Sequence, residues 1–203
     1  MALPKTIVFD LGKVLLDFDY SIAARRIAAK ARFEGDISQF FTAHSELLVR
    51  YETGLISSFE FYKSICRVTG FSGSFEEFGG YFGDIFTEIS PMVNFQSKLR
   101  RSGFPTFIFS NTNELAVDHI RRAFPFFENF DGFIFSYEHH SMKPAPKIYE
   151  VVEGQTGRTG SEILYLDDRL ENIDAGRARG WQVLLQESPE QSLAQAATLG
   201  LPT

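Results

Sequence analysis

Three short apolar runs in this chain each end in residues that can take part in a reaction. The runs are Thr6–Phe9, Thr106–Phe109 and Ile163–Leu166, and the polar residues that follow them are Asp10, Ser110 with Asn111, and Asp167 with Asp168. Each run has the length and the β-branched or aromatic composition of a buried parallel strand. In an open α/β sheet, ligands bind outside the carboxyl ends of the strands. The sequence therefore predicts one composite site, of a kind suited to a phosphate and a metal ion.

Strands and helices alternate along most of the chain. The strands are expected at about 6–10, 105–110, 132–136, 163–167 and 182–186, and helical patterns fill the gaps between them. Pro91 is suited to the first turn of one helix and Gly180 to the end of another. This alternation favours an α/β domain with a five-stranded parallel sheet and right-handed crossovers.

The first connection in the predicted sheet is too long for one crossover. A βα crossover unit takes about 30 residues, yet the first strand ends near Asp10 and the second begins near Pro105. The extra residues have helical patterns throughout, with helices expected to begin near Ser21, Asp36, Ser57 and Ser74. We predict a core domain of residues 1–18 and 91–203, and an inserted helical cap domain of residues 19–90. Such a cap can exclude water and select the substrate.

The acidic strand ends allow both a structural and a chemical interpretation. Asp10 can cap a turn, or its carboxylate can attack phosphorus and form an aspartyl-phosphate. Asp167 and Asp168 repel each other unless a cation pairs with them. Mg²⁺ typically takes one or two carboxylates together with substrate phosphate, whereas the structural alternative is that Asp168 caps a helix. The adjacent pair favours the divalent cation.

The remaining polar segments are suited to an anion. Residues 110–113 offer a hydroxyl, amides and the N–H groups of a helix N-terminus, which together can bind a phosphate. One of these residues is expected to cap the following helix. Lys143 lies in a loop at the same level of the sheet. It can neutralise the aspartates and a bound phosphate, or it can be a solvated loop lysine, and both interpretations fit the local sequence.

Composition and charge narrow the class of protein. The formal net charge of −6 disfavours a nucleic-acid or membrane-surface role, which needs a basic surface. No apolar stretch approaches the roughly 20 residues of a membrane span, and the N-terminus leads into the first strand without a signal-peptide pattern. The single cysteine fits a reducing compartment. We expect a cytoplasmic monomer or weak homodimer whose partner is a small-molecule phosphate ester.

Four segments, taken in this order, resemble the motifs of the haloacid dehalogenase (HAD) superfamily. They are Phe9–Leu15, Phe109–Asn113, Lys143–Tyr149 and Leu166–Asn172. The helical insertion after the first motif is similar to the C1-type cap of that family. The resemblance implies a HAD-like, Rossmann-like fold with helices on both faces of the sheet, and a hydrolase of phosphoric monoesters. Within the family, the chain is most similar to bacterial phosphatases that act on sugar phosphates such as glucose 1-phosphate.

The resemblance also implies a role for each site residue. Asp10 would be the nucleophile. The groups that would hold the phosphoryl oxygens are Ser110, Asn111 and Lys143. Ser110 and Lys143 would also be catalytic. Mg²⁺ would be bound by Asp10, the Gly12 carbonyl and Asp168. Asp167 and Asn172 would support this metal site without binding the ion directly.

Gly12 departs from the family pattern, because many family phosphatases carry a general acid/base Asp at this position. Two alternatives to a phosphatase stay open. One is a metal-independent 2-haloacid dehalogenase of the same fold, which the acidic pair argues against, and the other is a catalytically weak regulatory or binding protein, which Gly12 motivates. Without an acid here, leaving groups that need little protonation should react best. Asp17 and Asp19 could supply the proton from the cap entrance, or they could belong to a solvated turn. Substitutions in Arg50–Glu52 are expected to change relative rates among sugar phosphates more than rates with small aryl phosphates; equal losses on every substrate would mark these residues as structural.

Overall fold

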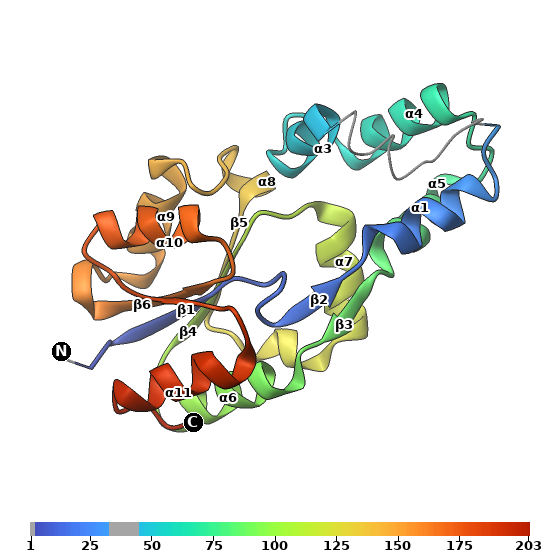
Figure 1. Cartoon of the computed structure of the whole chain (residues 1–203). Coiled ribbons are helices and arrows are strands. Elements are labelled where there is room, and N and C mark those ends of the chain that lie inside the picture. The colour runs from blue at the N-terminus through green and yellow to red at the C-terminus, as the bar shows by residue number, and fades with distance from the viewer. Residues whose placement is uncertain (1–2, 33–44) are drawn as a thin grey trace.

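A central sheet of five parallel strands organises the molecule (Figure 1). The computed structural model describes residues 3–32 and 45–203. The strand order is β5-β4-β1-β6-β7, with bounds β1 Thr6–Phe9, β4 Thr106–Ser110, β5 Gly132–Phe135, β6 Ile163–Asp167 and β7 Gln182–Leu185. The predicted α/β class is confirmed. Because β1 pairs with both β4 and β6, the three strands with polar ends are neighbours.

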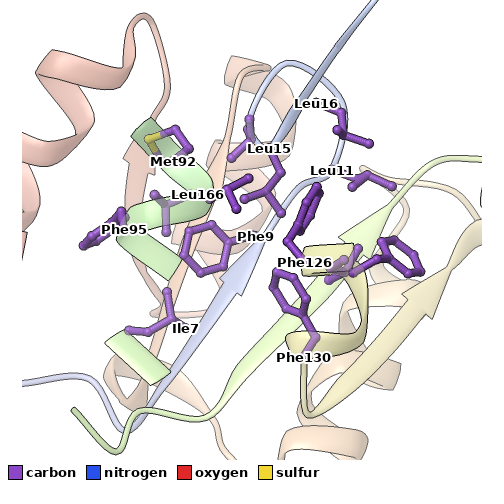
Figure 2. Close-up of a cluster of buried hydrophobic side chains, with 14 of the residues drawn as sticks. Ile7, Phe9, Leu11, Leu15, Leu16, Met92, Phe95, Phe126, Phe130 and Leu166 are labelled. Carbon is purple, nitrogen blue, oxygen red and sulfur yellow. The ribbon is translucent and has the colours of Figure 1, made fainter. Parts of the chain in front are cut away.

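Helices cover both faces of this sheet because successive strand side chains point to opposite sides. Ile7 and Phe9 join one apolar cluster, shown in Figure 2, whereas Val8 joins another on the opposite face. The first cluster is completed by α6 Ser90–Arg101, α7 Glu114–Ala123 and α11 Pro189–Thr198, and the second by α9 Pro146–Thr156 and α10 Leu170–Ala178. The short elements are α8 Ser136–His139 and the 3₁₀ turns Pro125–Asn129 and Gly160–Glu162. In the described ranges, no helix is both long and apolar enough to cross a bilayer.

The insertion between β1 and β4 has an aromatic core of its own. Its described helices are α1 Tyr20–Ala28, α3 Ser45–Glu52, α4 Ser58–Thr69 and α5 Phe75–Gly83. Ser57 and Ser74 form the expected capping boxes, whereas α1 is capped by Asp19 rather than by Ser21. The helix expected near Asp36 lies outside the described residues. Rings such as Phe61 and Phe78 fill the interior, so the insertion packs around them.

A short two-stranded ribbon, which the sequence analysis did not predict, joins the two ends of the helical insertion. Leu16–Phe18 forms β2 and Phe86–Glu88 forms β3, and the two strands pair antiparallel. Each strand has only three residues, and the two are separated in the sequence by the whole helical insertion. No local periodicity therefore marks either one. The ribbon brings the two chain connections to the insertion side by side (Figure 1).

Candidate active site

A cavity of about 250 Å³ lies beyond the carboxyl ends of β1, β4 and β6. Eight residues were assigned a role in binding the phosphoryl group or the metal. Seven of them line the cavity: Asp10, Gly12, Ser110, Asn111, Lys143, Asp168 and Asn172. The eighth, Asp167, is fully buried in contact with two of them. The structure therefore brings the predicted strand-end residues together in one place.

Lys143 is the cation at the centre of this site. Its side chain is buried, and Nζ lies 2.9 Å from Asp10 Oδ1 and 2.7 Å from Asp167 Oδ2. Nζ also donates a hydrogen bond to the Phe109 carbonyl. Burial alone would lower the pKa of the ammonium, but the two carboxylates outweigh it and raise that pKa. Of the two interpretations open in the sequence, the structure has the buried, neutralising lysine.

Asp10 is held in one orientation at the end of β1. Its Oδ1 accepts a hydrogen bond from the Leu11 N–H at 2.7 Å and contacts Lys143 on the same oxygen. Burial raises the pKa of Asp10 to about 7; the Lys143 ammonium opposes this rise and the charge of Asp167 adds to it. One lysine therefore does not compensate this carboxylate fully, and a further cation nearby would favour its ionised form.

Asp167 is committed to holding other side chains. Besides Lys143, it accepts hydrogen bonds from the Tyr165 hydroxyl, from the Arg169 N–H at 2.8 Å and from Asn172 Nδ2 at 3.0 and 3.1 Å. Burial opposes its ionisation, but these partners outweigh burial and hold its pKa below the usual value. Asn172 is therefore engaged with Asp167, which suits a supporting group better than a metal ligand.

Asp168 has a different environment from its neighbour. Within the described residues it forms no ion pair, and α10 begins after Arg169 without a side-chain cap, so Asp168 does not cap that helix. Burial and the nearby Asp167 raise its pKa. Oxygens of Asp10, Asp167 and Asp168 lie within 4.8 Å of one another. Three crowded carboxylates share one ammonium and lie next to the backbone of Gly12. Their oxygen atoms are the hard donors that Mg²⁺ prefers, so these residues fit this ion.

The end of β4 forms the anion-binding side of the cavity. Asn111 is fixed by two hydrogen bonds with the backbone of Lys143, one in each direction, at 3.0 and 2.8 Å. Asn113 caps α7 by accepting from the Ala116 N–H. Ser110 lies next to these residues at the cavity wall. The Ser110 hydroxyl and the Lys143 ammonium therefore lie together where a phosphate would need donors. The Leu115 and Ala116 N–H groups at the start of α7, expected to be free, are instead bonded to Tyr51 and Asn113.

The sequence identified only part of the side of the cavity that faces the insertion. Phe18, Tyr20, Leu48 and Glu52 line it there. Within the Arg50–Glu52 segment, only the glutamate does so, because Tyr51 is buried against Phe61 with ring centroids 4.5 Å apart. The helical pattern predicts which residues share a face, but it does not say which face meets the core domain.

The chain is similar in sequence and in fold to several known proteins. A family model described as a haloacid dehalogenase-like hydrolase matches residues 4–180. A D-ribitol-5-phosphate phosphatase of Bacteroides thetaiotaomicron is 25% identical over 191 residues, covering 91% of this chain and 92% of the relative. A sesquiterpene phosphatase of Aspergillus oryzae is 25% identical over 179 residues, covering 87% and 86%. A HAD family enzyme of B. thetaiotaomicron, solved with magnesium and inorganic phosphate, superposes with a TM-score of 0.77 at 22% identity, covering 90% and 93%.

Proposed function

The chain belongs to the haloacid dehalogenase-like hydrolase family, and on that premise we propose that it is a Mg²⁺-dependent phosphatase of small phosphate monoesters, sugar phosphates among them. The observation that carries the proposal is the convergence of Asp10, Asp167 and Asp168 within 4.8 Å around one buried lysine. A phosphatase with this site needs a cation, whereas a dehalogenase that attacks carbon does not. The names of the two phosphatase relatives support the same activity.

Asp10 is the nucleophile in this proposal. Its carboxylate attacks phosphorus, the bond to the leaving oxygen breaks, and an aspartyl-phosphate forms on the side chain. The contacts of Oδ1 with the Leu11 N–H and Lys143 hold the carboxylate in place for this attack. Water then hydrolyses the aspartyl-phosphate and restores Asp10.

The remaining site residues bind the phosphoryl group and the metal. Lys143 and the Ser110 hydroxyl hold phosphoryl oxygens, and the Asn111 side chain fixes the loop that carries the lysine. Asp10, the Gly12 carbonyl and Asp168 would hold Mg²⁺, which offsets the charge that develops on the transferred group. Asp167 and Asn172 keep Lys143 and the metal-binding loop in position.

The insertion acts as a cap domain in this proposal. Its lining residues Tyr20 and Glu52 lie on the side of the cavity that faces away from the sheet. The phosphate binds at the strand ends, so the leaving group projects toward these side chains. We assign residues 19–90 to the cap, with the β2–β3 ribbon at its base.

Turnover of a substrate panel tests the proposal. The panel contains sugar phosphates, sugar-alcohol phosphates and a terpenyl monophosphate, each assayed with Mg²⁺ and with excess chelator. We expect metal-dependent phosphate release and, after an acid quench, a phosphoryl group on the peptide that contains Asp10. Halide release from 2-haloacids, undiminished by the chelator, would instead establish the dehalogenase. Binding of these esters without turnover would establish the regulatory alternative.

A further inference from the structure

The space next to Gly12 is already filled, so the structure leaves no room there for the side chain of a general acid. A Cβ atom at this position would lie 2.8 Å from Cε1 of Phe18, closer than real side chains approach. Phe18 itself packs against the rings of Tyr20 and Phe86, with centroids 5.4 and 6.1 Å apart. A carboxylate could not be added at Gly12 without moving this aromatic group.

The two nearby aspartates have other partners. Asp17 is exposed and forms an ion pair with Lys13. Asp19 caps α1, accepting hydrogen bonds from the N–H and the hydroxyl of Ser21, both at 2.8 Å. Neither residue lines the cavity. The proton source that the sequence offered near the first strand is therefore directed elsewhere.

Among the described residues of the insertion, Glu52 is the carboxyl group that lines the cavity. It is the last residue of α3 and lines the same cavity as Asp10. Its Oε1 accepts a hydrogen bond from the Tyr20 hydroxyl at 3.4 Å. Among the described residues it forms no ion pair, unlike the buried aspartates at the strand ends. Its side chain therefore faces the place where a leaving group would lie.

The backbone of Glu52 is fixed to the loop that binds the phosphate. The Ser136 hydroxyl donates to the Glu52 carbonyl at 2.6 Å and accepts from the Thr112 N–H at 2.9 Å. One residue earlier, the Tyr51 hydroxyl accepts from the Leu115 N–H at the start of α7. These contacts join the end of α3 to the core domain, so the backbone of Glu52 is held beside the cavity that Asp10 also lines.

The surroundings of Glu52 raise its pKa into the neutral range, so both its protonated and its ionised form are well populated there. Burial raises its pKa to about 7, and the hydrogen bond from Tyr20 and the charge of Arg169 offset part of that rise. Tyr20 comes from α1 and Arg169 from the turn before α10, whereas α8 meets Glu52 through the neutral Ser136 hydroxyl. A carboxyl group whose pKa lies near the working pH is well suited to give and take a proton.

We propose that Glu52 is the general acid and base of this enzyme, taking the place of the missing carboxylate at Gly12. The inference rests on the proposed phosphatase function. As Asp10 attacks phosphorus and the bond to the leaving oxygen breaks, the carboxyl proton of Glu52 passes to that oxygen. In the second step water attacks phosphorus, the Glu52 carboxylate accepts the proton of the water, and the bond from phosphorus to Asp10 breaks. Both side chains return to their starting states.

Two substrates of similar size separate proton donation from binding. The leaving group of p-nitrophenyl phosphate is stable without a proton, whereas that of benzyl phosphate is a basic alkoxide. Neither carries a hydroxyl that Glu52 could recognise. The quantity compared is kcat/KM, which reports steps up to leaving-group departure. A Glu52→Gln substitution keeps the size and hydrogen-bonding capacity of the side chain and removes its acidic proton.

We expect Glu52→Gln to leave kcat/KM for p-nitrophenyl phosphate nearly unchanged and to lower it for benzyl phosphate by about 10²–10⁴-fold, the usual contribution of a positioned acid. With both substrates kcat should fall, because hydrolysis of the aspartyl-phosphate loses its base. Glu46→Gln, exposed on the same helix, is the matched control and should behave as wild type.

The other outcomes overturn distinct claims. Equal losses of kcat/KM with both substrates would make Glu52 a positioning residue, and equal retention would remove it from the reaction; either result overturns this inference and leaves the phosphatase intact. A wild-type protein that hydrolyses neither ester in Mg²⁺ would instead overturn the proposed function itself.

Discussion

The two walls of the cavity give their carboxyl groups different partners. On the core wall, formed by the ends of β1, β4 and β6, the carboxylates of Asp10 and Asp167 share a lysine at 2.9 and 2.7 Å. On the insertion wall, formed by α1 and α3, Glu52 has one long hydrogen bond from Tyr20 and no ion pair among the described residues. Lys143 and several hydrogen-bond donors hold the pKa of Asp167 below its usual value. Burial raises the pKa of both Asp10 and Glu52 to about 7, but Asp10 contacts an ammonium and lies where a further cation would favour its ionised form, whereas Glu52 has neither and can hold a proton.

The largest expected effect falls on the core wall. Asp10→Asn preserves the shape of the side chain, but the amide cannot form the aspartyl-phosphate and carries no charge toward the metal. We expect turnover to fall by at least about a thousandfold while the fold persists. Steady-state rates and far-ultraviolet circular dichroism measure the two quantities. Asp118→Asn, at an exposed position of α7, should match wild type. Substantial residual turnover in the Asp10 variant would mean that another residue is the nucleophile.

The second prediction concerns the ion pairs that hold the core wall together. Lys143→Met leaves two buried carboxylates without their cation, which should lower the free energy of unfolding by about 3–5 kcal/mol. Urea denaturation without metal measures this loss, and Lys147→Met, exposed four residues away, is the control. If both variants unfold at the same urea concentration, the ion pairs do not stabilise this wall.

A third prediction tests whether the core wall is completed by a divalent cation. Mg²⁺ should raise the melting temperature because it binds the folded state. At a concentration of 100 Kd, the free energy of unfolding should increase by about 2.7 kcal/mol. Asp168→Asn should remove most of this stabilisation and Asn172→Ala less of it, since the asparagine contacts Asp167 instead. Thermal denaturation over a Mg²⁺ titration measures both. A wild-type melting temperature independent of Mg²⁺ would count against the metal site.

The smallest expected effect is a shift of a pH profile on the insertion wall. The protonated form of Glu52 donates the proton, so the rate with benzyl phosphate relative to p-nitrophenyl phosphate should fall as the pH rises through about 7. Tyr20→Phe removes a hydrogen bond that lowers the pKa of Glu52, so the fall should move to higher pH, by less than about one unit. An unchanged midpoint, or one at lower pH, would show that Tyr20 does not act on this carboxyl group.

The sequence predicted the core wall well because its information is local. Each apolar run ends at the residue whose side chain enters the cavity, and parallel strands place such ends along one edge. Asp10, Ser110 and Asp168 could therefore be named from strand ends alone. Lys143 could not be assigned in the same way, because a lysine in a loop looks the same in sequence whether it is solvated or buried between two carboxylates.

Most residues of the insertion wall could not be predicted from the sequence, for a geometric reason. Helical periodicity indicates that Tyr51 and Glu52 lie on different faces of α3, but which face meets the core domain depends on contacts such as the one between Ser136 and the Glu52 carbonyl. The β2–β3 ribbon was missed as well, because its pairing joins segments on either side of the insertion.

The sequence by itself determined the fold class, the positions of the buried strands along the chain and the chemistry at their ends. Strand and helix periods, caps and apolar runs act over a few residues, so they can be read from a single chain. The tertiary structure alone decided that Phe18 fills the space beside Gly12 and that Glu52 shares a cavity with Asp10. Those two facts depend on how the insertion packs against the sheet, and packing between distant segments leaves no local pattern in the sequence.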